Sequence, residues 1–454
     1  MGVDRLLSTV LSLAEDLDSL SDELHFACRD LADRAPLDHG AANVLRALTL
    51  PCDARVLEIG AGYGALTRYL GEQAEVVHAI EPDEGRAEAV RARTGELRTV
   101  EVSTDDPRKL PSGTEYDLVV VAQPYATRTL LESVRRRLSP HGAVVVTTRS
   151  RAVVNTLADA GLDVTRELLC SPGHEIARSV RSARLDAEAP RLAAAIADGP
   201  GQGLLLLAGP GAGALWPSDR LATYFNTTER AAFACTRADI VRTSGGAEVR
   251  RVPLRPSTAV AGISVGPWTD PVYDASTILE VLLAAPERAG DLLPAWRDLL
   301  RAEAARGVRA LWDLVPHNVV VDGETLHPID LEWRHTGAGV AEVTERGVLV
   351  LADKLASADW RGAADGGTTR ELAGWLGVLA GLDPSFVDSA VEREIDFATI
   401  GSCGAVHGTA EIRAAISDIW HARLERTVHS AEDRPDAEAA EYGRLSDENK
   451  EAKP

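Results

Sequence analysis

Cysteine is scarce in this chain of 454 residues, and long apolar runs are absent. The five cysteines contain no Cys-x-x-Cys pair and their number is odd, so the sequence indicates neither a disulfide framework nor a zinc knuckle. The longest aliphatic runs, such as residues 204–207, are only as long as a strand, and acidic residues interrupt the N-terminal apolar stretch. We therefore expect a cytoplasmic protein with no targeting signal and no membrane span.

Lysine is also rare, and basic residues as a whole are outnumbered. Only four of the 48 basic residues are lysines, and 69 acidic residues give a formal net charge of −21. Such a charge repels phosphate backbones and anionic lipid headgroups, so nucleic acid is not an expected partner. With 45% hydrophobic and 26% charged residues, most of the chain has the composition of a packed protein.

The spacing of apolar residues predicts several segments of different character. Residues 1–50 have helical spacing, and residues 51–185 alternate short aliphatic strands with helix-length segments, which predicts an α/β domain with a mainly parallel sheet. The Ala-, Pro- and Gly-rich stretch 186–203 is interpreted as a linker. Residues 204–430 then begin with strands and continue with helices, an α+β order, and the polar tail 431–454 is expected to be disordered.

A glycine-rich turn follows the first predicted strand, in the segment VLEIGAGYGALTRYLG at 56–71. Residues without a Cβ allow a sharp turn and a close ligand, and a helix N-terminus presents free N–H groups. About twenty residues later the second strand ends in Glu81, an acid that can accept both hydroxyls of a ribose. A plain turn between strand and helix is the alternative interpretation. The candidate residues of the turn itself are Glu58, Gly60, Gly62 and Gly64.

These residues resemble the first motif of class I S-adenosylmethionine (SAM)-dependent methyltransferases, an acid followed by three alternating glycines. The resemblance implies a Rossmann-like domain in which the glycines pass the methionine part of SAM and Glu81 holds the ribose. It also places Asp106 near the adenine. The fourth strand ends in Ala-Gln-Pro-Tyr, which lacks the first Asn or Asp of amino-group methyltransferases, so Gln123 is expected only to line the pocket.

A second set of polar residues lies in the segment LWDLVPHNVVVDGETLHPIDLEW. Asp313 and Asn318 are five positions apart, and a pair of short strands leads on to Asp330. This spacing suits a loop in which one carboxylate meets a hydroxyl, while the amide and the second carboxylate share Mg²⁺ on the phosphates of ATP. A loop that merely leads into a hairpin is the alternative, since Asp, Pro and Asn are ordinary loop residues.

The segment resembles the catalytic loop and metal-binding Asp of kinase-like and aminoglycoside-phosphotransferase-like folds. The resemblance implies a two-lobed domain with Asp313 as base and with Asn318 and Asp330 as metal ligands. The sequence departs from these folds in two respects. No glycine-rich phosphate loop precedes the segment, and Arg251 or its neighbour Arg250 stands nearest to the expected lysine. Arg is not equivalent to Lys, so a non-catalytic lobe remains open.

Together the two parts resemble bifunctional methyltransferase/kinase proteins of bacterial polysaccharide synthesis. The resemblance implies an enzyme that uses SAM, with ATP and Mg²⁺ at the second site, and acts on a hydroxyl of a glycan or small molecule. One alternative is a small-molecule methyltransferase of natural-product tailoring, whose C-terminal part only binds the acceptor. The other is an interaction protein with a kinase-like scaffold and a vestigial first domain.

Overall fold

The fold is known from a computed structural model of the whole chain. It describes residues 3–27, 35–108, 113–197, 203–228, 230–256, 258–309, 311–358, 360, 362, 367–401, 413–414 and 416–421. The predicted disordered tail at 431–454 is outside the described residues. Within the described part, no helix is both long enough and apolar enough to cross a lipid bilayer.

The N-terminal residues form helices that pack on the first part of the molecule. Helix α1 (Val3–Leu13) has a marked apolar face and lies against α5 (Glu84–Thr94). Its buried Leu7 and Leu11 join Leu24 of α2 (Asp22–Ala27) and Tyr63 in one apolar cluster. Because Tyr63 belongs to the glycine-rich turn, the N-terminal helices cover one side of that turn.

A mainly parallel sheet forms the first part of the chain, as the alternation of strands and helices predicted. Its order is β3-β2-β1-β4-β5-β8-β6, and β8 alone runs antiparallel to its neighbours. The strands are β1 (Arg55–Ile59), β2 (Val76–Ile80), β3 (Val100–Ser103), β4 (Tyr116–Ala122), β5 (Leu138–Thr148), β6 (Val164–Ser171) and β8 (Gly203–Ala208). The helices are α3 (Asn43–Arg46), α4 (Ala65–Gln73), α5, α6 (Arg128–Arg135), α7 (Ala152–Asp159) and α10 (Ala212–Leu215).

The position of β8 corrects the predicted organisation between the two parts. The strand expected to open the second domain instead pairs with β5 and β6, and all six of its residues are buried. A strand that is apolar on both faces belongs inside a covered sheet, which explains why four leucines in a row occupy it. The stretch predicted as a linker, 186–203, contains most of α8 (Arg184–Glu188) and all of α9 (Pro190–Ile196).

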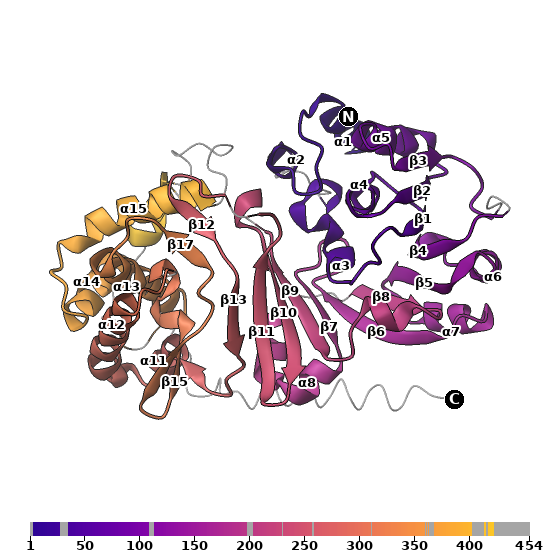
Figure 1. Cartoon of the computed structure of the whole chain (residues 1–454). Coiled ribbons are helices and arrows are strands. Elements are labelled where there is room, and N and C mark those ends of the chain that lie inside the picture. The colour runs from indigo at the N-terminus through magenta and orange to yellow at the C-terminus, as the bar shows by residue number, and fades with distance from the viewer. Residues whose placement is uncertain are drawn as a thin grey trace, which may run out of the picture.

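The same sheet continues beyond β6 and joins the two parts of the chain. Five further antiparallel strands bring the total to 12, and they lie in the middle of the molecule (Figure 1). These strands are β7 (Ser179–Ser182), β9 (Arg220–Asn226), β10 (Thr236–Thr243), β11 (Gly246–Pro253) and β13 (Trp268–Pro271). Helices α8 and α9 pack their apolar residues on β9, β10 and β11.

The remaining part is mainly helical, and its short strands lie both before α11 and between α12 and α13. Its core contains the buried Trp296, whose indole N–H donates to the carbonyl of Leu314 (3.0 Å). The helices are α11 (Ile278–Ala284), α12 (Ala289–Ala305), α13 (Val340–Ser357), α14 (Thr369–Leu379) and α15 (Phe386–Gly401). Two small sheets accompany them, built from β12 (Ile263–Val265) with β17 (Trp333–His335), and from β14 (Ser276–Thr277), β15 (Val319–Asp322) and β16 (Thr325–Pro328).

Candidate functional site

The glycine-rich turn lies where β1 ends and α4 begins. Gly60, Gly62 and Gly64 all have positive φ (85°, 58° and 76°), a conformation that residues with a Cβ rarely adopt. A Cβ on Gly64 would lie 3.2 Å from the Cα of Val90, whereas a Cβ on Gly62 would meet no described atom within 4 Å. The middle of the turn is therefore open to a ligand, while Gly64 allows α4 to pack closely on α5.

Glu81 is brought directly onto this turn. It follows β2, is 2% exposed, and its Oε2 accepts a hydrogen bond from the backbone N–H of Gly62 (2.8 Å). Its Oε1 accepts from the N–H of Asp83 (3.1 Å). Because Gly62 and Glu81 follow neighbouring strands, the sequence predicted that they lie in one site. In the structure a direct hydrogen bond joins them.

Glu58 is the second buried acid beside the turn. It is the fourth residue of β1 and is 2% exposed. Burial, with the negative charge of Glu81 added, raises the pKa of Glu58 to about 7. The hydroxyl of Thr67 is close enough to oppose this rise in pKa, but Oε2 of Glu58 makes no hydrogen bond in the part of the chain that the structure describes. A buried carboxylate oxygen without a partner is costly, and a positively charged ligand group would satisfy it.

Two further predicted residues, Gln123 and Asp106, already make side-chain hydrogen bonds within the protein. The Oε1 of Gln123, directly after β4, accepts from the hydroxyl of Thr148 and the N–H of Arg149, both at 2.9 Å. The carboxylate of Asp106 accepts two hydrogen bonds from the guanidinium of Arg108, both at 2.9 Å. An adenine contact by Asp106 therefore remains a prediction, and it requires Arg108 to share or release that carboxylate.

Tyr125 is a site residue that the sequence analysis did not single out. Its ring carbons lie within 2.7 Å of the position that a Cβ on Gly60 would occupy, so the ring packs on the backbone of the turn. Burial raises the pKa of Tyr125, and the charge of Glu81 adds to the rise. The available signal was its place two residues after Gln123, at the end of a strand beside β1.

The second polar set also comes together in three dimensions. The side-chain amide of Asn318 donates to the carbonyl of Asp313 (3.0 Å), and the N–H of Ile329 donates to the carbonyl of Asn318 (2.8 Å). The Oδ2 of Asp313 accepts from the backbone N–H groups of Glu332 (3.2 Å) and Trp333 (3.3 Å). Burial raises the pKa of Asp313, with the charge of Glu332 as the next cause.

Arginines face the acids of this cluster. From β11, Arg251 places Nε 2.5 Å from Oδ1 of Asp330 and Nη1 2.9 Å from Oδ2 of Asp270. Arg230 was not predicted. It comes from the connection between β9 and β10, where the sequence offered no glycine, and its Nη1 lies 2.6 Å from Oε1 of Glu332. Burial raises the pKa of Asp330, and the nearby Arg251 opposes that rise.

A cavity of about 210 Å³ adjoins Arg251. Its apolar walls come from β11, from the β15–β16 region and from α9, the helix within the predicted linker. Arg191 of α9 stands on the same cavity and reaches Ser276 (3.1 Å) and Glu280 (3.3 Å). Its lining includes Arg191, Leu192, Val249, Arg251, Val320 and Ile329, together with the carboxylates of Asp270 and Glu280.

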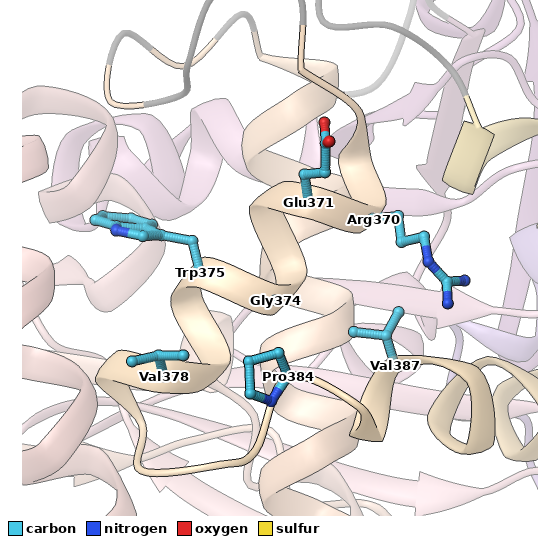
Figure 2. A pocket seen from close by; sticks show the side chains of 7 residues that line it. All are labelled: Arg370, Glu371, Gly374, Trp375, Val378, Pro384 and Val387. Carbon is cyan, nitrogen blue, oxygen red and sulfur yellow. The ribbon is translucent and has the colours of Figure 1, made fainter.

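A second hollow, of about 370 Å³, lies on α14 and the start of α15 (Figure 2). Trp375 and Val378 face it and are exposed by 45% and 54%. Its charged residues are Arg370 and Glu371, and Glu371 already caps α14 through the N–H of Thr368. The hollow contains none of the predicted site residues, so the candidate chemistry lies in the other two places.

Comparison with known proteins identifies the first part of the chain. Residues 56–142 match the family model described as "Methyltransferase domain", and this span includes the glycine-rich turn, Glu81 and Gln123. No curated protein matches the chain. Residues 56–142 therefore match a methyltransferase domain, which agrees with the SAM-dependent methyltransferase that the turn and its acid predicted.

Several solved structures are similar to part of the chain. They include the N-methyltransferase NodS from Bradyrhizobium japonicum WM9 (17% identity, 37% of this chain and 91% of that chain, TM-score 0.28). A SAM-dependent methyltransferase from Aquifex aeolicus is 18% identical over 40% of this chain and 95% of that chain, with a TM-score of 0.29. A precorrin-6y C5,15-methyltransferase from Geobacter metallireducens GS-15 is 16% identical over 43% and 98%, with a TM-score of 0.30.

Proposed function

We propose that the turn at Gly60–Gly64, together with Glu58 and Glu81, holds SAM. SAM supplies an electrophilic methyl group on a positively charged sulfur. Three features of the chain suit this molecule: the open space above Gly62, the carboxylate of Glu81 on the turn, and the unpartnered buried oxygen of Glu58. Glu81 would accept from the ribose hydroxyls, and Glu58 would face the cationic end.

The methyl acceptor is proposed to be a hydroxyl of a small molecule or glycan. Methyl transfer requires mainly alignment of the acceptor with the methyl group. Gln123 and Tyr125 are uncharged residues that follow β4, and the ring of Tyr125 packs on the turn. A neutral acceptor meets no repulsion from a chain of net charge −21. The described cysteines, Cys52, Cys170 and Cys235, are free thiols, which supports the proposed cytoplasmic location.

One observation carries the proposal for the second part. Of the residues that the sequence selected as one phosphate-handling set, Asn318 hydrogen-bonds to Asp313 and Asp330 pairs with Arg251, and Arg251 also lines a cavity. We propose that this part is a kinase-like domain whose cavity binds a nucleoside triphosphate. Val249, Val320 and Ile329 would enclose the base, and Arg251 would face the phosphates.

Magnesium fits this cluster poorly. Asp330, one of the two expected metal ligands, already faces Arg251 at 2.5 Å. The side-chain amide N–H of Asn318 donates to the backbone carbonyl of Asp313, which does not occupy the amide oxygen through which asparagine binds a metal ion. Among the described residues, no three His, Cys, Asp or Glu side chains are grouped so that they could hold a metal ion. We therefore favour a nucleotide-binding module over an active kinase, and we assign no step to Mg²⁺.

Phosphoryl transfer to a glycan or small-molecule hydroxyl is the second candidate function. It is favoured by the proximity of Asp313 and Asn318, the pair expected of a catalytic loop. Incubation with labelled ATP and candidate acceptors tests it. Transfer that Asp313→Asn abolishes would establish the second candidate, and ATP binding without transfer would support the nucleotide-binding module.

The proposed SAM site is tested by titration calorimetry with a matched pair of variants. Gly62→Val places a side chain in the open space above the turn, and we expect it to abolish SAM binding. Gly323→Val is the control, because Gly323 also has positive φ (60°) and no described atom within 4 Å of its Cβ position, but lies in the β15–β16 turn. Equal SAM affinity in the two variants would contradict the assignment.

A further inference from the structure

We infer that His39 is a positioning residue of the proposed SAM site. Stacked on His25, its uncharged imidazole holds residues 3–27, the N-terminal cover, against the glycine-rich turn. The inference rests on the assignment of SAM to that turn, and it adds a dependence on pH that comes from residues outside the turn. Acid should loosen the cover and thereby weaken the hold on SAM.

The N-terminal cover contacts the turn through Tyr63. This residue is 9% exposed and packs in one apolar cluster with Leu24 of the cover and with Leu37. Leu24 directly precedes His25, and Leu37 stands two positions before His39. The two segments that pack on Tyr63 are therefore the same two segments that meet through the imidazoles.

The two imidazoles form a buried, nearly parallel stack. Their ring centroids are 4.1 Å apart with an interplanar angle of 9°, and His25 and His39 are 8% and 1% exposed. The backbone N–H of His39 donates to Nδ1 of His25 (3.2 Å), so this nitrogen acts as an acceptor and carries no proton. A proton added to His39 would place a charge inside the protein, against the face of another ring, where it is costly.

Titratable and charged groups from several elements surround the stack. They are Asp22, Asp38, Arg46, Arg230 and Cys235. Oδ1 of Asp22 lies 3.4 Å from Nε2 of His39, and Oδ2 of Asp38 lies 3.5 Å from Nδ1 of His25. The side chain of Asp22 is 42% exposed, and its Oδ1 already accepts from the backbone N–H of Ala232 (2.8 Å). Because solvent screens an exposed carboxylate, Asp22 attracts a proton on His39 only weakly.

The other neighbours of His39 oppose a charge on it. Burial, then the imidazole of His25 and the guanidinium of Arg46, lower the pKa of His39 well below its ordinary value. Sγ of Cys235 lies 3.7 Å from Nδ1 of His39, and burial raises the pKa of this thiol to about 12, so it supplies no negative charge. Once released from the stack, an ordinary imidazole takes a proton below about pH 6.5. His39 therefore stabilises the bound cover fully above that pH, and this contribution is lost as the pH falls.

The test is hydrogen exchange of the full chain, read by mass spectrometry at about pH 8 and about pH 5.5 and corrected for intrinsic exchange rates. The opening constant of residues 3–27 should rise by roughly tenfold at the lower pH, the shift that one imidazole of ordinary pKa produces. In His39→Gln, which cannot take the proton, we expect a rise of less than about threefold. Saturating SAM should reduce the opening of residues 3–27 at both pH values.

The matched control is His317→Gln. His317 is also a buried imidazole, and burial lowers its pKa to about 3, but it lies in a short helix (Pro316–Asn318) of the second part. This variant should keep the roughly tenfold rise of the natural chain in residues 3–27. Glu58 titrates alike in all three proteins, so its contribution cancels in the comparison.

The outcomes separate this inference from the proposal on which it rests. An equal rise in His39→Gln and in the natural chain would overturn the role of His39. Should His39→Gln fail to fold, a rise in residues 3–27 of the natural chain no larger than that in α12 would overturn it as well. SAM that binds without protecting residues 3–27 would overturn the link between the cover and the cofactor. Absence of SAM binding would overturn the proposed function and this link, whereas the pH dependence of the cover is read without SAM.

Discussion

Replacing Glu58 with glutamine should stabilise the free protein at neutral and alkaline pH while weakening the binding of SAM. Burial raises the pKa of this carboxyl from 4.5 to about 7, so the folded state holds its proton more tightly than the unfolded state. The unfolded state therefore releases the proton first as the pH rises, and stability falls between about pH 4.5 and pH 7. Each unit between the two pKa values is worth about 1.4 kcal/mol, which gives a loss of ~3 kcal/mol above pH 7.

Glutamine keeps the shape of Glu58 and carries no titrating group, so it removes this loss. The free energy of unfolding, measured by urea denaturation from pH 4 to pH 8, should be similar for both proteins near pH 4 and diverge by ~3 kcal/mol by pH 8. Glu75→Gln, a change of an exposed acid immediately before β2, should show no such divergence. A constant difference between Glu58→Gln and the natural chain across this range would refute the argument.

The same variant separates stability from function. If Glu58 faces the cationic end of SAM, the Glu58→Gln protein should bind SAM more weakly at pH 8, by roughly tenfold for a lost charge-assisted contact. Binding sites often carry groups that reduce the stability of the free protein. Unchanged SAM affinity at pH 8 would show that the unpartnered oxygen of Glu58 serves another purpose.

Three further changes test other parts of the structure. Glu81→Gln should weaken SAM binding by roughly 10- to 100-fold in calorimetry, because the ribose hydroxyls lose a charged acceptor. The backbone N–H of Gly62 still has the amide oxygen of glutamine as its acceptor. Near-native affinity would contradict this prediction. Leu205→Ala, in the fully buried β8, should cost about 2–5 kcal/mol in denaturation; a change under 1 kcal/mol would argue against its place inside the sheet. Arg230→Met should cost about 3–5 kcal/mol because Glu332 is left buried without its partner; a neutral effect would show that this pair contributes no stability.

The proximity of Gly62 and Glu81 could be predicted from the sequence because the signals for it are local. A turn of alternating glycines after an apolar strand requires positive φ at fixed positions, and an acid at the end of the next parallel strand must reach the same sheet edge. Both Gly62 and Glu81 follow from these rules. Tyr125 did not, since its packing on Gly60 depends on how the chain turns after β4.

The organisation of the chain was harder to predict because it depends on pairing between distant segments. Four consecutive leucines suit a strand buried on both faces, but this pattern does not say which strands flank it. The run at 204–207 was therefore assigned to a new domain, whereas β8 completes the first sheet. Arg230 was missed for a similar reason. It reaches Glu332 from a distant segment of the chain, and the sequence before β10, which lacks a glycine-rich loop, gave no sign of this contact.

The most direct test of the central claim is a crystal structure of the protein with S-adenosylhomocysteine, the product of SAM after methyl transfer. We predict that the ligand lies across Gly60–Gly64 with its ribose hydroxyls within hydrogen-bond distance of Glu81. A ligand bound elsewhere, with Glu81 still occupied only by the N–H groups of Gly62 and Asp83, would contradict the account.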